Sequence, residues 1–141
     1  EATYRARIGR MMAMSDMVKL SDEDLRWLEG EGEIGDLVSG LLAHGPKIVF
    51  VTEGAKGAHA FTAHDAVFVP AQKVKVADTV GAGDTFNAGV LAALHQAGLL
   101  TRTALAGIGP DALKAAATLG NRAAAITVSR PGANPPWANE L

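Results

Sequence analysis

Asp78-Thr79-Val80-Gly81-Ala82-Gly83-Asp84-Thr85-Phe86-Asn87 is the stretch around which the chain is organised, because an extended segment here meets two near-adjacent glycines and turns into a helix. A strand that passes through glycines into a helix N-terminus directs several free backbone N–H groups at one point, where the helix dipole adds partial positive charge. This stretch therefore predicts an anion site. Asp84 has two interpretations: a helix cap, or a base beside a bound phosphate.

The composition favours one ordinary globular domain. The chain has 141 residues, of which 48% are apolar and 20% charged, so a real core can form. A formal net charge of −2 at pH 7 leaves no basic surplus for a phosphate backbone, and no nucleic-acid partner is expected. The absence of cysteine excludes disulfides and fits a cytoplasmic protein. No apolar run is long enough for a membrane span, and no membrane partner is expected.

The first part of the chain predicts two helices around a short strand. Apolar side chains in residues 4–12 recur at helical spacing, and we expect this amphipathic helix to pack on a sheet. Residues 17–20 form a short strand. Ser21 then caps a helix and Asp24 completes its capping box, with the helix ending near Gly30.

The middle of the chain predicts a buried strand and a hairpin. Residues 34–42 carry a second helical stripe, and residues 47–52 form a continuous apolar strand of the kind that is buried in a parallel sheet. A glycine-bearing turn covers residues 53–57. Residues 59–61 and 67–69 then form a hairpin.

Two further helices and a loop complete the pattern. The helix after the opening stretch ends at Gly98, and a long alanine-rich helix starts near Pro110, where its small side chains allow close approach to a neighbour. The tail, residues 130–136, is an ordered loop. Helices and buried strands alternate, which predicts a layered α/β fold with a mainly parallel sheet.

Three glycine-rich turns follow predicted strands, at residues 52–57, 81–84 and 130–132. In an open α/β sheet, ligands gather outside the carboxyl ends of the strands, so these turns are the candidate site. Neither of the first two is a Walker A loop, because no Gly-Lys-Ser/Thr follows the glycines. The dinucleotide-binding fingerprint is also absent, because its third glycine would fall at position 86, where the chain has Phe86.

Residues 78–86 resemble, nearly residue for residue, the C-terminal signature of the ribokinase-like (PfkB-type) carbohydrate kinases. Residues 51–58 look like the nucleotide-phosphate turn of this family, and residues 121–133 look like its adenine-side helix and cation loop. Residues 18–24 are similar to its Asn-x-x-Glu segment, with Ser21 and Asp24 at those two positions, a version more typical of fructokinase-like members.

The resemblance implies a fold, a three-layer α/β sandwich, and an activity, the phosphorylation of a sugar hydroxyl by ATP. Mg²⁺ would be required, and K⁺ is a further candidate ion. Only the C-terminal half of such a kinase is matched, and the chain begins at Glu1 without an initiator methionine. Residues 1–141 would then be the nucleotide-binding and catalytic portion of one kinase domain, inactive alone. Family members are often dimers through a lid that is absent here.

Phosphoryl transfer needs charge stabilisation on the transferred oxygens, an in-line nucleophile and a carboxylate that accepts its proton. Backbone N–H groups of Ala82, Gly83 and Asp84, in a turn that begins at Gly81, would stabilise the charge on the transferred oxygens. The Asp84 carboxylate would accept the proton. By resemblance, the nucleotide would be bound by Thr52, Glu53, Gly54, Lys56, Gly57 and Asn121. A solvated turn lysine is the alternative for Lys56.

Two further sets of residues have roles by resemblance and simpler structural alternatives. Ser21 and Asp24 would lie near phosphate and Mg²⁺, or would serve only as a helix cap. A monovalent cation would be held by Asp78, Val80, Thr127, Arg130 and Gly132, largely through backbone carbonyls. Alternatively, Asp78 only buttresses the turn.

Three functional hypotheses stay open. The first is a sugar kinase, with fructose favoured over ribose or 2-keto-3-deoxygluconate. The second is a non-catalytic nucleotide- or phosphate-binding remnant of the same fold. The third is a structural module whose glycine turns bind nothing, which predicts no thermal shift with Mg·ATP.

Overall fold

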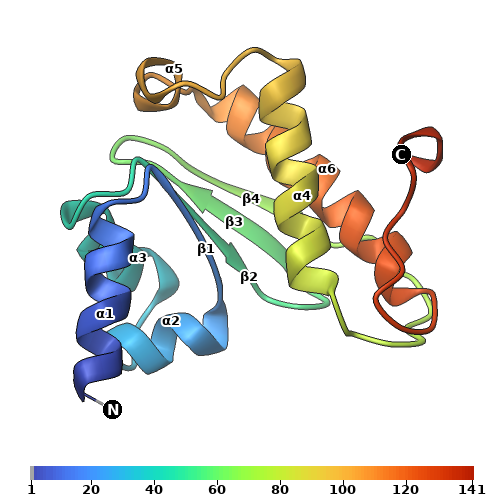
Figure 1. Ribbon diagram of the computed structural model, residues 1–141, viewed down its shortest axis with the longest axis horizontal. Coiled ribbons are helices and arrows are strands. Elements are labelled where there is room, and N and C mark those ends of the chain that lie inside the picture. The colour runs from blue at the N-terminus through green and yellow to red at the C-terminus, as the bar shows by residue number, and fades with distance from the viewer. Residues whose placement is uncertain (1) are drawn as a thin grey trace.

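A four-stranded sheet separates two layers of helices in the computed structural model, which describes residues 2–141 (Figure 1). The strands are β1 (Met17–Ser21), β2 (Ile48–Thr52), β3 (Gly57–Phe61) and β4 (Ala66–Pro70). One side carries α1 (Ala2–Ala13), α2 (Asp22–Glu29) and α3 (Ile34–Ala43). The other carries α4 (Ala82–Gln96) and α6 (Pro110–Val128), joined through the short α5 (Arg102–Ala106), and the 3₁₀ turn Ala138–Glu140 ends the chain. The expected three-layer α/β architecture is confirmed.

The sheet is mixed, in the order β1-β2-β3-β4. β1 and β2 are parallel, joined by a crossover through α2 and α3, whereas β2–β3 and β3–β4 are antiparallel. The expectation of a mainly parallel sheet is therefore corrected for these strands. The physical reason is that the turns at residues 53–56 and 62–65 are too short for a parallel crossover, which needs a dozen or more residues.

β2 lies at the centre of the core because both of its faces are covered. Ile48 and Phe50 pack with α4, α5 and α6, where the Phe50 ring meets the Phe86 ring edge-on at 6.1 Å between centroids. Val49 and Val51 face the other way and pack with α2 and α3. This two-sided burial explains why the strand is continuously apolar.

α4 and α6 cross at unusually small separation because each contributes a glycine. A Cβ placed on Gly89 would lie 2.8 Å from the Cα of Gly120. A Cβ placed on Gly120 would lie 2.9 Å from the ring of Phe86. The crossing holds Phe86 and Gly89 of α4 against Leu119 and Gly120 in the middle of α6.

Two of the three glycine-rich turns do not follow a strand, contrary to the prediction. Residues 71–80 are irregular, with Val74 and Val76 exposed, so the opening stretch is preceded by a loop rather than by a strand. Residues 126–128 continue α6, where the Thr127 hydroxyl donates to the Ala123 carbonyl at 3.1 Å. The turn at residues 130–132 therefore follows a helix, and only the turn at residues 52–57 follows a strand.

The first helix packs less than expected. Met12 contacts the core of α2 and α3, but Tyr4 and Met11 are 59% and 64% exposed. The Tyr4 ring instead rests edge-on against Trp27 of α2. The expectation that the apolar stripe of this helix packs on the sheet was wrong for most of its length. No helix in residues 2–141 combines the length and apolar character needed to cross a membrane.

Candidate active site

The N-terminus of α4 offers open backbone donors. Gly81 caps the helix with φ of 79°, a left-handed conformation that favours glycine. The Ala82 N–H donates to the Thr79 carbonyl at 3.3 Å, so it is not open as expected. The N–H groups of Gly83 and Asp84 donate to no acceptor among residues 2–141. Two of the three predicted donors are therefore available to an anion.

The Asp84 side chain is exposed, and in the described part of the chain it makes neither a hydrogen bond nor an ion pair. No side-chain hydrogen bond caps α4, so the interpretation of Asp84 as a hydrogen-bonding cap is not supported. Its carboxylate stabilises the helix through the dipole alone. Asp84 lines a cavity of about 360 Å³ together with Gly83, Asn87 and Lys19.

Lys19 is a site residue that the sequence analysis missed. It lies half-buried in β1, and its Nζ is so near α4 that a Cβ on Gly83 would be only 2.7 Å from it. Burial lowers the pKa of Lys19, and the nearby carboxylates of Asp24 and Asp84 oppose that shift only in part. The available signal was a lysine among apolar residues in the predicted strand 17–20.

A second cavity, of about 400 Å³, lies on the other side of the α4 N-terminus. Thr52, Gly54, Gly57 and Asn121 line it, as predicted for the nucleotide. Most of the remaining lining is apolar, including Val74, Val76, Ala124, Ala125 and Val128, and Gln72, Lys73 and Thr79 are its polar members. Apolar walls suit a base, and glycine turns let backbone approach phosphates, so these residues fit ATP. Gly83 lines both cavities.

Asn121 and Gly57 shape this second cavity through contacts with β4. The buried Asn121 amide nitrogen donates to the carbonyls of Val69 and Pro70, at 2.9 and 3.3 Å. A Cβ on Gly57 would lie 2.2 Å from the Val69 carbonyl oxygen, so only glycine fits there. The end of β4 is thus held between the two predicted nucleotide residues.

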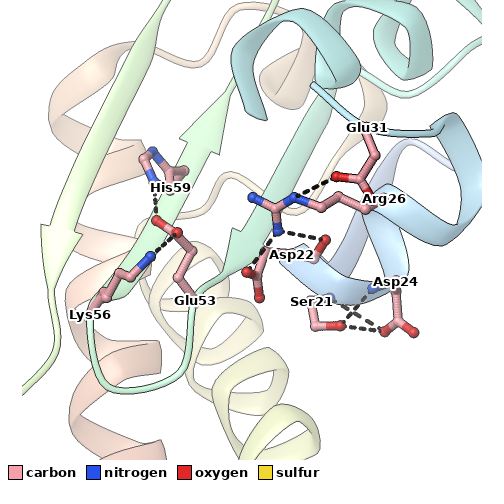
Figure 2. A network of polar contacts seen from close by, with 8 residues as sticks. All are labelled: Ser21, Asp22, Asp24, Arg26, Glu31, Glu53, Lys56 and His59. Atoms are coloured by element: carbon pink, nitrogen blue, oxygen red, sulfur yellow. Dashed lines mark hydrogen bonds and ion pairs between the residues drawn. The ribbon is translucent and has the colours of Figure 1, made fainter. Parts of the chain in front are cut away.

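Glu53 and Lys56 are not brought to this cavity. Figure 2 shows Lys56 Nζ directed at Glu53, at 3.0 Å, with His59 Nε2 on the second carboxylate oxygen at 2.8 Å. Both contacts lower the pKa of Glu53, and the hydrogen bond from Lys56 has the larger effect. The Lys56 side chain is 74% exposed. The geometry supports the interpretation of Lys56 as a solvated turn lysine.

Ser21 and Asp24 form the predicted capping box at the start of α2 (Figure 2). The Asp24 N–H donates to Ser21 Oγ at 3.0 Å, and the Ser21 hydroxyl donates to Asp24 Oδ2 at 2.8 Å. Ser21 also pairs with Thr52 in the sheet, which places the box beside the nucleotide turn. Residues 2–141 contain no cluster of three His, Asp or Glu side chains able to hold a metal ion. A role near Mg²⁺ stays a prediction.

Asp78 joins two loops. Its Oδ1 accepts from the Val80 N–H and its Oδ2 from the Gly132 N–H, both at 3.0 Å, and these bonds lower the pKa of Asp78. Thr127 is fully buried within α6, and the Arg130 guanidinium pairs with Glu140. The buttress interpretation is therefore supported, and cation binding stays a prediction.

Comparison with known proteins identifies the family. Residues 1–140 match the family described as pfkB family carbohydrate kinase. A fructokinase of Rhizobium leguminosarum bv. trifolii is 48% identical over 112 residues, which cover 79% of this chain and 34% of that protein. The chain thus spans about a third of the length of this relative.

Two solved structures are similar in fold. A fructokinase of Xylella fastidiosa with bound ATP matches with a TM-score of 0.82 at 26% identity, covering 92% of this chain and 41% of that one. A fructokinase of Vibrio cholerae O395 bound to fructose, ADP and calcium matches with a TM-score of 0.76 at 30% identity, covering 92% and 40%. Since the family match extends over nearly every residue, this chain belongs to the pfkB family of carbohydrate kinases and shares part of their ribokinase-like α/β fold.

Proposed function

We propose that residues 1–141 form the nucleotide-binding and catalytic portion of an ATP-dependent sugar kinase whose substrate is fructose. One observation carries the proposal: within residues 2–141 the Asp84 carboxylate has no partner, and it lies beside two open backbone donors and next to Gly83, which lines both cavities. The nucleotide would occupy the cavity of Asn121 and Gly54, and the sugar would approach from the cavity of Asp84.

Asp84 acts as the general base. It accepts the proton of the sugar hydroxyl, whose oxygen forms a bond to the γ-phosphorus while the bridging P–O bond breaks and its electron pair leaves with ADP. The N–H groups of Gly83 and Asp84 donate to the oxygens of the transferred group, where negative charge is spread. Bound Mg²⁺ supplies further neutralisation of phosphate charge.

The remaining assignments rest on resemblance. Ser21 pairs with Thr52 in the edge strand, and Asp24 lies in the first turn of α2; the two would act near Mg²⁺ through water. Lys56 contacts phosphate only if its ammonium leaves Glu53. A monovalent cation near Asp78 predicts higher turnover in K⁺ than in choline salts, whereas a pure buttress predicts no difference.

Fructose is proposed because the similar curated proteins are fructokinases and one similar structure holds fructose. The sugar pocket, and the lid through which dimers would form, belong to an N-terminal portion of a longer polypeptide in this proposal. Ribose and 2-keto-3-deoxygluconate are the competing substrates.

The test is ADP release by the complete polypeptide that includes these residues, measured with fructose, ribose, 2-keto-3-deoxygluconate and adenosine. We expect ADP release that requires a sugar and is fastest with fructose. Absence of sugar-dependent release with every substrate would contradict the kinase proposal. In that case, a thermal shift with Mg·ATP would favour a nucleotide-binding remnant, and no shift would favour a structural module.

A further inference from the structure

The Lys19 ammonium occupies a position that local structure does not explain. It is the charged end of the side chain that approaches α4, because a Cβ on Gly83 would be 2.7 Å from Nζ but 3.9 Å from Cε. A helix N-terminus carries partial positive charge and disfavours a cation. The half-buried ammonium makes no contact ion pair within residues 2–141, although Asp24 and Asp84 act on it at longer range.

Donors without acceptors converge at this point. The ammonium carries three N–H donors and no acceptor, and the N–H groups of Gly83 and Asp84 are open beside it. A group with several anionic oxygens would satisfy this set. Neutral sugar hydroxyls would satisfy it less well, because charge-assisted hydrogen bonds are about twice as strong as neutral ones.

The position also lies on the route of the reaction. Gly83 lines both the nucleotide cavity and the cavity of Asp84, and Lys19 lines only the latter. In the proposed function, a phosphoryl group that moves from the nucleotide to the sugar passes from one cavity to the other beside Gly83. The ammonium therefore lies on the acceptor side of that transfer.

We propose that Lys19 is a further catalytic residue, whose ammonium contacts the oxygens of the phosphoryl group as it passes Gly83 from the nucleotide to the sugar. This assignment rests on the proposed kinase function and adds one cation to the two backbone donors. Asp84 still accepts the hydroxyl proton, and the bonds that form and break are those given above. Lys19 neither gains nor loses a proton in the step.

The test compares Lys19→Met with Lys114→Met in the complete polypeptide, using the sugar-dependent ADP assay. Loss of the cation should lower kcat by about 10²–10³-fold, as for removal of one oxyanion donor, with the Kd of Mg·ATP nearly unchanged. Lys114 is exposed on α6 and lines neither of the two cavities, so its replacement should leave kcat unchanged. Lys19→Gln provides a second uncharged variant in case the methionine disturbs folding.

Amine rescue separates catalysis from a structural role. Methylammonium added to Lys19→Ala should raise kcat in proportion to its concentration, since a small cation can occupy the vacated space. Full activity of Lys19→Met or Lys19→Gln, or a loss of kcat without rescue and with a lowered Tm, would overturn the assignment. An inactive wild-type protein would instead overturn the proposed kinase function.

Discussion

Asp78 holds the loop before α4 against the loop after α6 with a single carboxylate. Both of its oxygens accept backbone N–H groups, from Val80 and from Gly132. The turn that starts at Gly81 is therefore attached to the loop that follows α6. Loss of the hydrogen bonds to Asp78 should therefore shift the open N–H groups of Gly83 and Asp84.

Asp78→Asn should lower the Tm near neutral pH. Because the folded-state pKa of Asp78 lies below its ordinary value of 3.8, the carboxylate stabilises the fold above about pH 4, and this contribution is lost as the pH falls through the folded-state pKa. The Tm difference between wild type and Asp78→Asn should therefore shrink on acidification. Thermal melts of both proteins at neutral and acidic pH measure this Tm difference. A Tm difference that does not change with pH would contradict the account.

Individual residues were predictable where a local rule defines them. The capping box of Ser21 and Asp24 follows from spacing alone, and the turn at Gly81 follows from its two glycines. Lys19 was missed because its importance depends on the distance between β1 and α4, which no local pattern encodes. By resemblance, Glu53 and Lys56 were candidate nucleotide residues, with a solvated turn lysine as the alternative for Lys56, and in the structure these two side chains pair with each other.

The crossing of α4 and α6 is the contact between elements that positions the site. It depends on Gly89 and Gly120, whose missing side chains let the two backbones meet. The crossing places Gly83 and Asn121 on the walls of one cavity. A wider crossing would move Gly83 away from Asn121 and open this cavity.

Gly89→Ala should destabilise the fold by about 1–3 kcal/mol, the usual cost of overpacking, although alanine is the better helix former. The reason is that the new Cβ would lie 2.8 Å from the Cα of Gly120 and 2.9 Å from the Leu119 carbonyl oxygen. Gly9→Ala in α1 is the matched control, because nothing lies within 4 Å of its Cβ. The midpoints of denaturant unfolding measure this loss of stability. Equal midpoints for Gly89→Ala and Gly9→Ala would contradict the prediction.

Helices and strands with a clear periodicity or a continuous apolar run were also predicted from the sequence. The hairpin β3–β4 and the central strand β2 follow from alternation and apolar runs. The turn at residues 130–132 was expected to follow a strand, yet the preceding β-branched residues 126–128 extend α6, where the buried Thr127 hydroxyl donates to the Ala123 carbonyl. Tertiary packing overrides propensity at such positions.

At the scale of the whole molecule, the chain is a partial kinase fold with an open sheet. β1 lies at one edge of the sheet, and Tyr4, Met11 and Met14 of the neighbouring α1 segment are exposed. The relative with 48% identity is about three times as long as the matched part. Strand order and this exposure could not be predicted, because they depend on contacts between distant segments.

The central claim is that the α4 N-terminus is a phosphoryl-transfer centre with Asp84 as its base, and Asp84→Asn in the complete polypeptide tests it most directly. Asp111→Asn is the matched control, since it removes a first-turn charge from α6 instead. We predict that Asp84→Asn lowers kcat by about 10²–10⁴-fold, the usual contribution of a general base, while Mg·ATP binding persists. Turnover of Asp84→Asn close to that of the wild type would contradict the account.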